Sequence, residues 1–65
     1  MFPTRMKQER IKRGWTQKKV ADAIGLTVTA ISDIENGHAK PSYKVLCQLE
    51  DMFELTHREL FKSVN

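Results

Sequence analysis

The sequence predicts an all-α fold made of five short helices, and three observations predict it. Capping residues precede short segments of helical character, apolar residues recur within them at helical spacing, and no useful stretch alternates as a strand would. The chain has 65 residues, which is enough for one domain and near the lower limit for folding on a core of its own. We therefore expect a single compact domain over residues 1–65, which dimerisation would stabilise.

Five segments carry the helix signals, in the order 4–13, 16–24, 27–36, 42–53 and 56–61. The last four begin with Thr or Ser, whose side-chain oxygen accepts a hydrogen bond from a free N–H group of the first turn. Thr56 and Glu59 have the spacing of a capping box. Gly14 ends the first segment and Gly37 follows the third, while Gly25 supplies the left-handed conformation for a tight turn.

The apolar residues of these segments predict one shared core. They recur at spacings that place them on one side of each helix, which is typical of helices that bury a single face. From the second segment onward they are Val20, Ala21, Ile24, Ile31, Ile34, Val45, Leu46, Leu49, Met52, Phe53, Leu60 and Phe61.

Composition bounds the function. The net charge is +3 and the pI about 9.3, with the cations concentrated in the first third and several acids in the last third. This distribution predicts a basic pole suited to phosphate and an acidic pole, although a solvated basic helix would have the same composition. Cys47 is the single cysteine, so we expect a reducing, cytoplasmic setting. No apolar run approaches a membrane span in length.

Enzyme chemistry is not expected. His38, His57 and Cys47 lie far apart in sequence, without metal-ligand spacing, and no glycine-rich phosphate loop is present. Asp33 and Glu35 are two residues apart on a helix, so they do not face each other as a carboxylate pair. We expect no cofactor and no metal.

Several short motifs occur in a fixed order along the chain. They are Gly14-Trp15-Thr16-Gln17, Val20-Ala21, Gly25-Leu26-Thr27, Ile31-Ser32, Ile34-Glu35-Asn36-Gly37 and Pro41-Ser42. Together they resemble the lambda-repressor and Cro-like (XRE-type) helix-turn-helix family over nearly the whole chain. The resemblance implies a helix-turn-helix at about 16–36 whose second helix enters the DNA major groove, with dimers on half-sites about one DNA turn apart. It also implies an ion pair between Arg10 and Glu35.

By family position, the base-contacting residues would lie on the third helix. They are Val28, Thr29, Ser32 and Asp33. Val28 and the Thr29 methyl group suit a thymine methyl, and Asp33 suits a cytosine amino group. The segment from Val20 to Ala39 has no Arg or Lys, so the commonest contact to guanine is missing. Either methyl contacts and DNA shape determine the site, or specificity is modest.

The resemblance places the phosphate contacts around that helix. They are Gln17, Lys18, Thr27, Asn36, Lys40 and Tyr43. Lys18 and Lys19 lie in the first turn of their helix, where the dipole disfavours cations and a phosphate would offset the cost. Solvated lysines are the alternative, and His38 is expected to be a solvated loop residue. Trp15 is expected either in the core or against the DNA backbone.

The C-terminal apolar residues predict a homodimer surface. They are Met52, Phe53, Leu55, Leu60, Phe61 and Val64, some of which would instead close the monomer core. The sequence thus predicts a dimeric, sequence-specific repressor of transcription on a partly palindromic double-stranded operator, bacterial or phage-encoded. No membrane contact is expected, and no small-molecule ligand, since the chain leaves no room for a sensing domain. The alternative is a protein-interaction module of the same fold, an antitoxin or polymerase-bridging factor, with weak DNA binding.

Overall fold

The computed structural model describes residues 4–62 and confirms the all-α prediction. Its five helices are α1 (Arg5–Lys12), α2 (Gln17–Ile24), α3 (Val28–Glu35), α4 (Tyr43–Phe53) and α5 (His57–Leu60). The predicted segments match these helices once their flanking cap residues are counted.

Side-chain caps begin four of the helices, as the sequence predicts. The hydroxyl groups of Thr16, Thr27 and Ser42 accept from backbone N–H groups at 3.0, 3.1 and 3.3 Å. Thr56 and Glu59 form the predicted capping box at the start of α5. Each cap satisfies a donor that the helix itself leaves unpaired.

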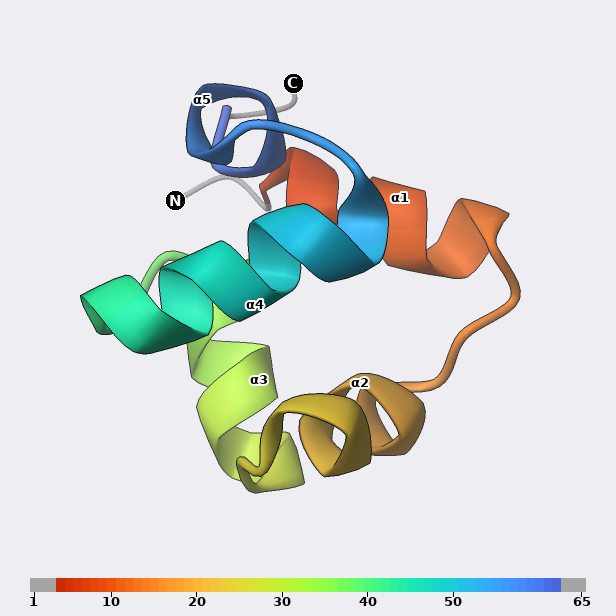
Figure 1. Cartoon of the computed structure of the whole chain (residues 1–65). Helices are drawn as coiled ribbons and strands as arrows, with labels where there is room; N and C mark the ends of the chain where they lie inside the picture. The colour runs from red at the N-terminus through yellow and green to blue at the C-terminus, as the bar shows by residue number, and fades with distance from the viewer. Residues whose placement is uncertain (1–3, 63–65) are drawn as a thin grey trace.

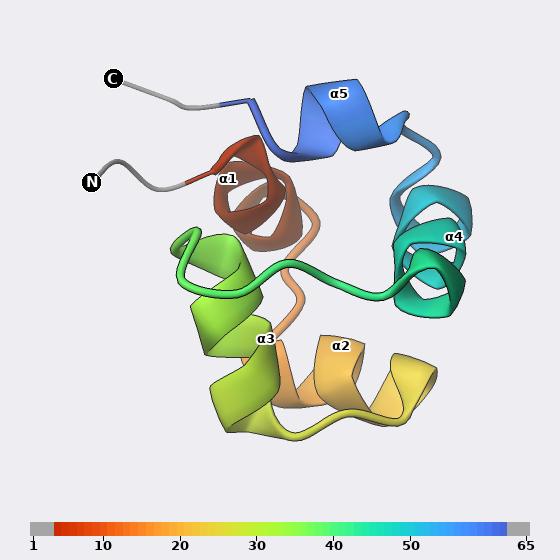
Figure 2. The same ribbon diagram turned by 90° about the vertical axis from the view of Figure 1, so that its left-hand side faces the viewer.

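The turn between α2 and α3 depends on Gly25, which has a left-handed φ of 75°. The N–H of Leu26 returns to the carbonyl of Ala21 at 2.9 Å, which closes the end of α2. Only Thr27 then separates Leu26 from the first residue of α3. This short connection turns the chain sharply, and α3 leaves α2 at a steep angle (Figures 1 and 2).

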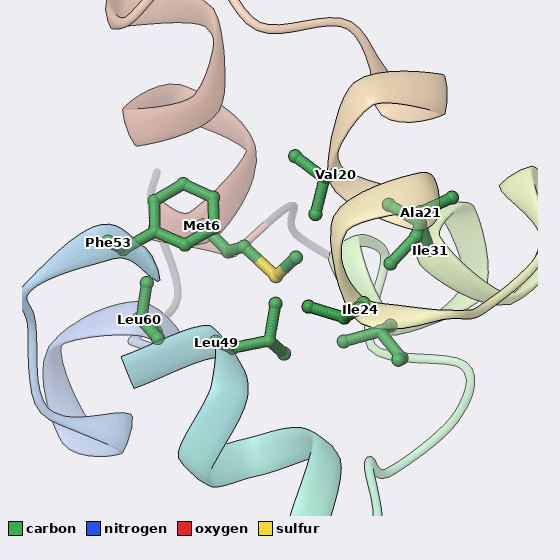
Figure 3. Packing of buried hydrophobic residues seen from close by; sticks show 9 residues of the cluster. Met6, Val20, Ala21, Ile24, Ile31, Leu49, Phe53 and Leu60 are labelled. Carbon is green, nitrogen blue, oxygen red and sulfur yellow. The ribbon is translucent and has the colours of Figure 1, made fainter. Parts of the chain in front are cut away.

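All five helices contribute to one apolar core. Its buried members are Met6, Val20, Ala21, Ile24, Ile31, Ile34, Leu49, Phe53 and Leu60. Met6 comes from α1, and its side chain points into the middle of the group, between Val20 of α2 and Leu49 of α4 (Figure 3). Because a flexible thioether fills irregular space well, one methionine joins helices that approach at different angles.

The arrangement of the helices separates two ends of the molecule. In both views, α2 and α3 lie at one end and α5 at the other, with α1 and α4 between them (Figures 1 and 2). None of the described helices is long and apolar enough to cross a membrane.

Burial corrects part of the predicted dimer surface. Phe53 and Leu60 are wholly buried in the monomer core, so their side chains offer no area to a second copy. Met52, Leu55 and Phe61 are half-buried at the edge of the core. Val64 lies outside the described residues. The sequence pattern identified these residues as apolar, but only the packing of α4 against α5 determines which of them stay accessible.

Candidate nucleic-acid interface

The outer side of α3 is the part of the helix that the core leaves uncovered. Ile31, Ile34 and Glu35 are buried, whereas Val28 and Thr29 are exposed and Ser32 and Asp33 half-buried. These last four are the residues predicted to contact bases, and the helix places them on the side away from the core. We call them the recognition face.

A buried ion pair holds the end of α3 against α1. Arg10 Nε lies 2.6 Å from Glu35 Oε2, and Glu35 is 0% exposed. The same guanidinium donates to the carbonyl of Trp15 at 2.8 Å. The predicted Arg10–Glu35 pair is therefore present, and it joins the first helix, the loop after it and the exposed helix.

Gln17 connects the start of α2 to this ion pair. Its side-chain amide donates to Glu35 Oε1 at 3.1 Å. A glutamine amide carries two N–H donors, so one remains for another acceptor. The contact keeps the first residue of α2 at a constant position relative to α3, and the proposed phosphate contact of Gln17 would use the second donor.

Thr4 fixes the C-terminal end of α3 from the other side. Its backbone N–H and its hydroxyl both donate to the carbonyl of Glu35, at 3.0 and 2.9 Å. This carbonyl belongs to the last turn of α3, whose carbonyl groups find no N–H donors within the helix itself. Sequence reasoning missed this role because Thr4 and Glu35 are 31 positions apart.

The first turn of α2 presents two exposed lysines. Lys18 Nζ lies 3.0 Å from Asp22 on the same helix, a partner that sequence analysis did not assign. Lys19 lies over the ring of Trp15, with 6.0 Å from Nζ to the ring centroid. Trp15 itself is half-buried and packs edge-on against Phe53 at 5.3 Å. Trp15 thus packs against the core, which is one of the two positions expected for it. The face of its ring also contacts the ammonium group of Lys19 at the surface.

The loop after α3 and the start of α4 flank the recognition face on the other side. Lys40 and Tyr43 are exposed there, and Tyr43 is 82% exposed. A hydrogen bond with the Cys47 side chain raises the pKa of the Tyr43 hydroxyl. Asn36 is half-buried and donates to Ser32 at 3.4 Å. His38 is exposed in the same loop, as expected.

Ion pairing corrects the predicted basic pole. Arg5 and Arg13 of the basic first third both pair with Glu9, Arg10 is buried against Glu35, and α1 packs beside α5 from the acidic third. The hydrogen bond from Arg13 is the main reason that the pKa of Glu9 lies below its ordinary value. Charge along the sequence therefore does not map onto two poles in space.

Arg13 is a second residue whose role the sequence did not indicate. Its guanidinium donates to the carbonyl of Phe53 at 2.8 Å and lies 5.6 Å from the centroid of the Trp15 ring. It therefore joins the loop before α2 to the end of α4.

Among residues 4–62, no three His, Cys, Asp or Glu side chains are grouped as a metal site would require.

Two helices joined by a glycine turn, with the second one exposed, form a helix-turn-helix motif. The whole domain carries that motif: the chain belongs to the helix-turn-helix family, whose model, described as Helix-turn-helix, matches residues 6–60. The resemblance inferred from the sequence motifs is thereby confirmed.

The similar proteins include regulators from one bacterium. The HTH-type transcriptional regulator AnsR of Bacillus subtilis is 32% identical over 86% of this chain and 48% of its own length. The SPbeta prophage-derived uncharacterized HTH-type transcriptional regulator YonR, also from Bacillus subtilis, is 31% identical over 100% of this chain and 60% of its own length. A third, YazB, is 30% identical over 86% of this chain and 81% of its own. The chain spans about half the length of AnsR.

Proposed function

We propose that this chain is a sequence-specific, double-stranded DNA-binding regulator of transcription, acting as a homodimeric repressor on a partly palindromic operator. The observation that carries the proposal is the recognition face: a helix held from behind by buried contacts and left open on its outer side. A helix presented in this way fits the major groove, where base edges are read. The names of the similar proteins, which are transcriptional regulators, agree with it.

The surroundings of α3 suit the DNA backbone. On one side are the capped start of α2 with Gln17, Lys18 and the exposed Lys19; on the other are Lys40 and Tyr43. Backbone phosphates run along both edges of a groove, so donors on both sides of a recognition helix set its depth and register. Thr27 and Asn36 would complete the phosphate contacts at the two ends of α3.

The size of the domain agrees with binding as a dimer. Its extents are 29 × 24 × 22 Å, and major-groove half-sites recur about every 34 Å along one face of B-DNA. Two copies therefore fit side by side on adjacent half-sites. We propose Met52, Leu55 and Phe61 as the dimer surface. Leu55 and Phe61 flank α5, at the end away from α3, and Met52 lies on α4 beside the C-terminal end of α2.

The first test is selection of bound sequences from a random duplex pool, followed by titration of the selected site at about 50 and 200 mM salt. We expect a short inverted repeat bound with a steep salt dependence. Thr29→Ala should weaken binding by about 1 kcal/mol, roughly fivefold, through the loss of one hydrogen bond. Lys40→Ala should weaken all sequences alike and reduce the salt slope by about one per protomer.

Lys62→Ala is the matched control for Lys40→Ala, because Lys62 is also exposed and follows α5 at the opposite end of the molecule. It should leave affinity and salt slope nearly unchanged. A pool without an enriched site, or binding indifferent to salt, would contradict the proposal. It would favour the protein-interaction alternative, in which the half-buried apolar residues near α5 contact a partner.

A further inference from the structure

One apolar side chain on α3 stands outside the core. Ile31 and Ile34 are 0% and 5% exposed, whereas Val28, the first residue of the helix, is 43% exposed. Thr29 is exposed beside it and adds a methyl group to the same end of the helix. An exposed branched side chain costs hydration free energy, which a contact with another apolar group recovers.

The hydrogen-bonding capacity of α3 is small by comparison. The helix, of sequence VTAISDIE, contains no Arg, Lys, Asn or Gln, the residues that make two hydrogen bonds to guanine or adenine. The Ser32 hydroxyl already accepts from Asn36 at 3.4 Å, and Glu35 is buried in its ion pair. The Thr29 hydroxyl, the O–H donor of Ser32 and the Asp33 carboxylate are the polar groups that remain for base edges.

Thymine is the one standard DNA base that presents a methyl group in the major groove. It therefore matches the surface that Val28 and Thr29 form better than any base read by hydrogen bonds. We infer that the chain reads a thymine in each half-site through its 5-methyl group, with Val28 as the specificity-determining residue. This inference rests on the proposed function and names the feature of DNA that the recognition face selects.

The test replaces thymine by uracil, one position at a time, in one half-site of the selected operator. Uracil keeps every hydrogen bond and lacks only the methyl group. At one thymine we expect about a fourfold loss of affinity, the effect of one methyl group that is no longer buried. At that position, a 5-methylcytosine–guanine pair should bind more tightly than an unmethylated cytosine–guanine pair by a similar factor.

Val28→Ala identifies the reading residue. The loss of affinity when uracil replaces thymine is called the uracil penalty. Compared with the unaltered chain, the variant should bind the thymine operator several-fold more weakly and the uracil operator equally well. Its uracil penalty should therefore disappear. Thr29→Ser keeps the hydroxyl and removes the methyl group, so it should reduce the uracil penalty less than Val28→Ala does. Ile11→Ala, at an exposed apolar residue of α1, should retain the penalty. Helicity measured by circular dichroism shows that each variant is folded.

The outcomes separate the two proposals. If the random pool contains no bound duplex, the proposed function falls and the inference falls with it. If a site is bound but no thymine in it is sensitive to uracil, the inference is overturned while the proposed function stands. If the uracil penalty persists in Val28→Ala, Val28 is not the reading residue and the inference is again overturned.

Discussion

At the scale of single residues, one buried carboxylate organises the binding end of the molecule. Glu35 is 0% exposed and accepts hydrogen bonds from Arg10 at 2.6 Å and from Gln17 at 3.1 Å. Its backbone carbonyl accepts from Thr4. Residues from α1, its N-cap and α2 thus meet at one residue of α3. Because a buried charge is tolerated only when it is paired, the contacts depend on one another.

Glu35→Ala should therefore cost far more stability than a surface substitution. Removing one partner of a buried ion pair leaves the other charge uncompensated, which costs about 3–5 kcal/mol. For a chain of this size that is most of the free energy of unfolding. Urea denaturation followed by circular dichroism measures it, with Asp51→Ala, at an exposed acid of α4, as the control.

A double variant tests the physical reason. Arg10→Leu combined with Glu35→Leu removes both charges, so it should recover much of the stability that Glu35→Ala loses. If Glu35→Ala changes the free energy of unfolding no more than Asp51→Ala does, the ion pair does not hold the helices together.

At the scale of helices, the ends follow local rules with one exception. Gly25 and Gly37 take left-handed φ angles of 75° and 76° after α2 and α3. α4 ends instead at Glu54, whose φ of 56° is left-handed without the freedom of glycine. A side chain at such an angle is disfavoured because Cβ approaches the following carbonyl oxygen.

Glu54→Gly should raise the free energy of unfolding by about 0.5–1 kcal/mol, since relief of the backbone conflict exceeds the added freedom of the unfolded chain. Thermal and urea denaturation measure the change. Lys44→Gly, inside the same helix, is the control and should lower stability by about 0.5 kcal/mol. If both variants lose stability, the left-handed backbone at Glu54 is not a significant cost.

At the scale of the whole molecule, the two ends have different surfaces. The recognition face and its flanking donors lie with α2 and α3, while the accessible apolar residues Leu55 and Phe61 lie near α5 (Figure 1). Such a separation allows two copies to associate at one end and bind at the other. Each protomer would then contribute its own phosphate contacts. Association would therefore raise the affinity for DNA and add the salt dependences of the two protomers.

Leu55→Lys should weaken self-association by about tenfold or more, because a charged side chain must lose its hydration in the contact. Sedimentation equilibrium over a range of concentrations measures it, and circular dichroism checks that the monomer remains helical. Ile11→Lys, at an exposed apolar residue outside the proposed surface, should leave association unchanged. Equal weakening by both variants, or an unaltered chain that stays monomeric, would contradict the dimer surface.

The sequence by itself determined the helices, their caps, the turn at Gly25 and the family, because those features depend on residues a few positions apart. Thr16, Thr27 and Ser42 cap their helices through hydrogen bonds to N–H groups of the first turn, which a Thr or Ser at that position makes in any fold. The apolar spacing likewise determines which face of each helix is buried. The family resemblance implied the residues of the recognition face, and the apolar spacing predicted only that Ile31 and Ile34 lie on the buried side of the same helix.

Only the tertiary structure decided which apolar residues stay accessible and which charges are free. Phe53 and Leu60 are buried because α4 and α5 pack around the same core. The arginines of α1 form ion pairs with residues up to 54 positions away, as Arg5 does with Glu59. The double contact of Thr4 with Glu35 has the same origin. Packing brings together residues that local rules treat as independent, so burial and pairing are properties of the assembled fold.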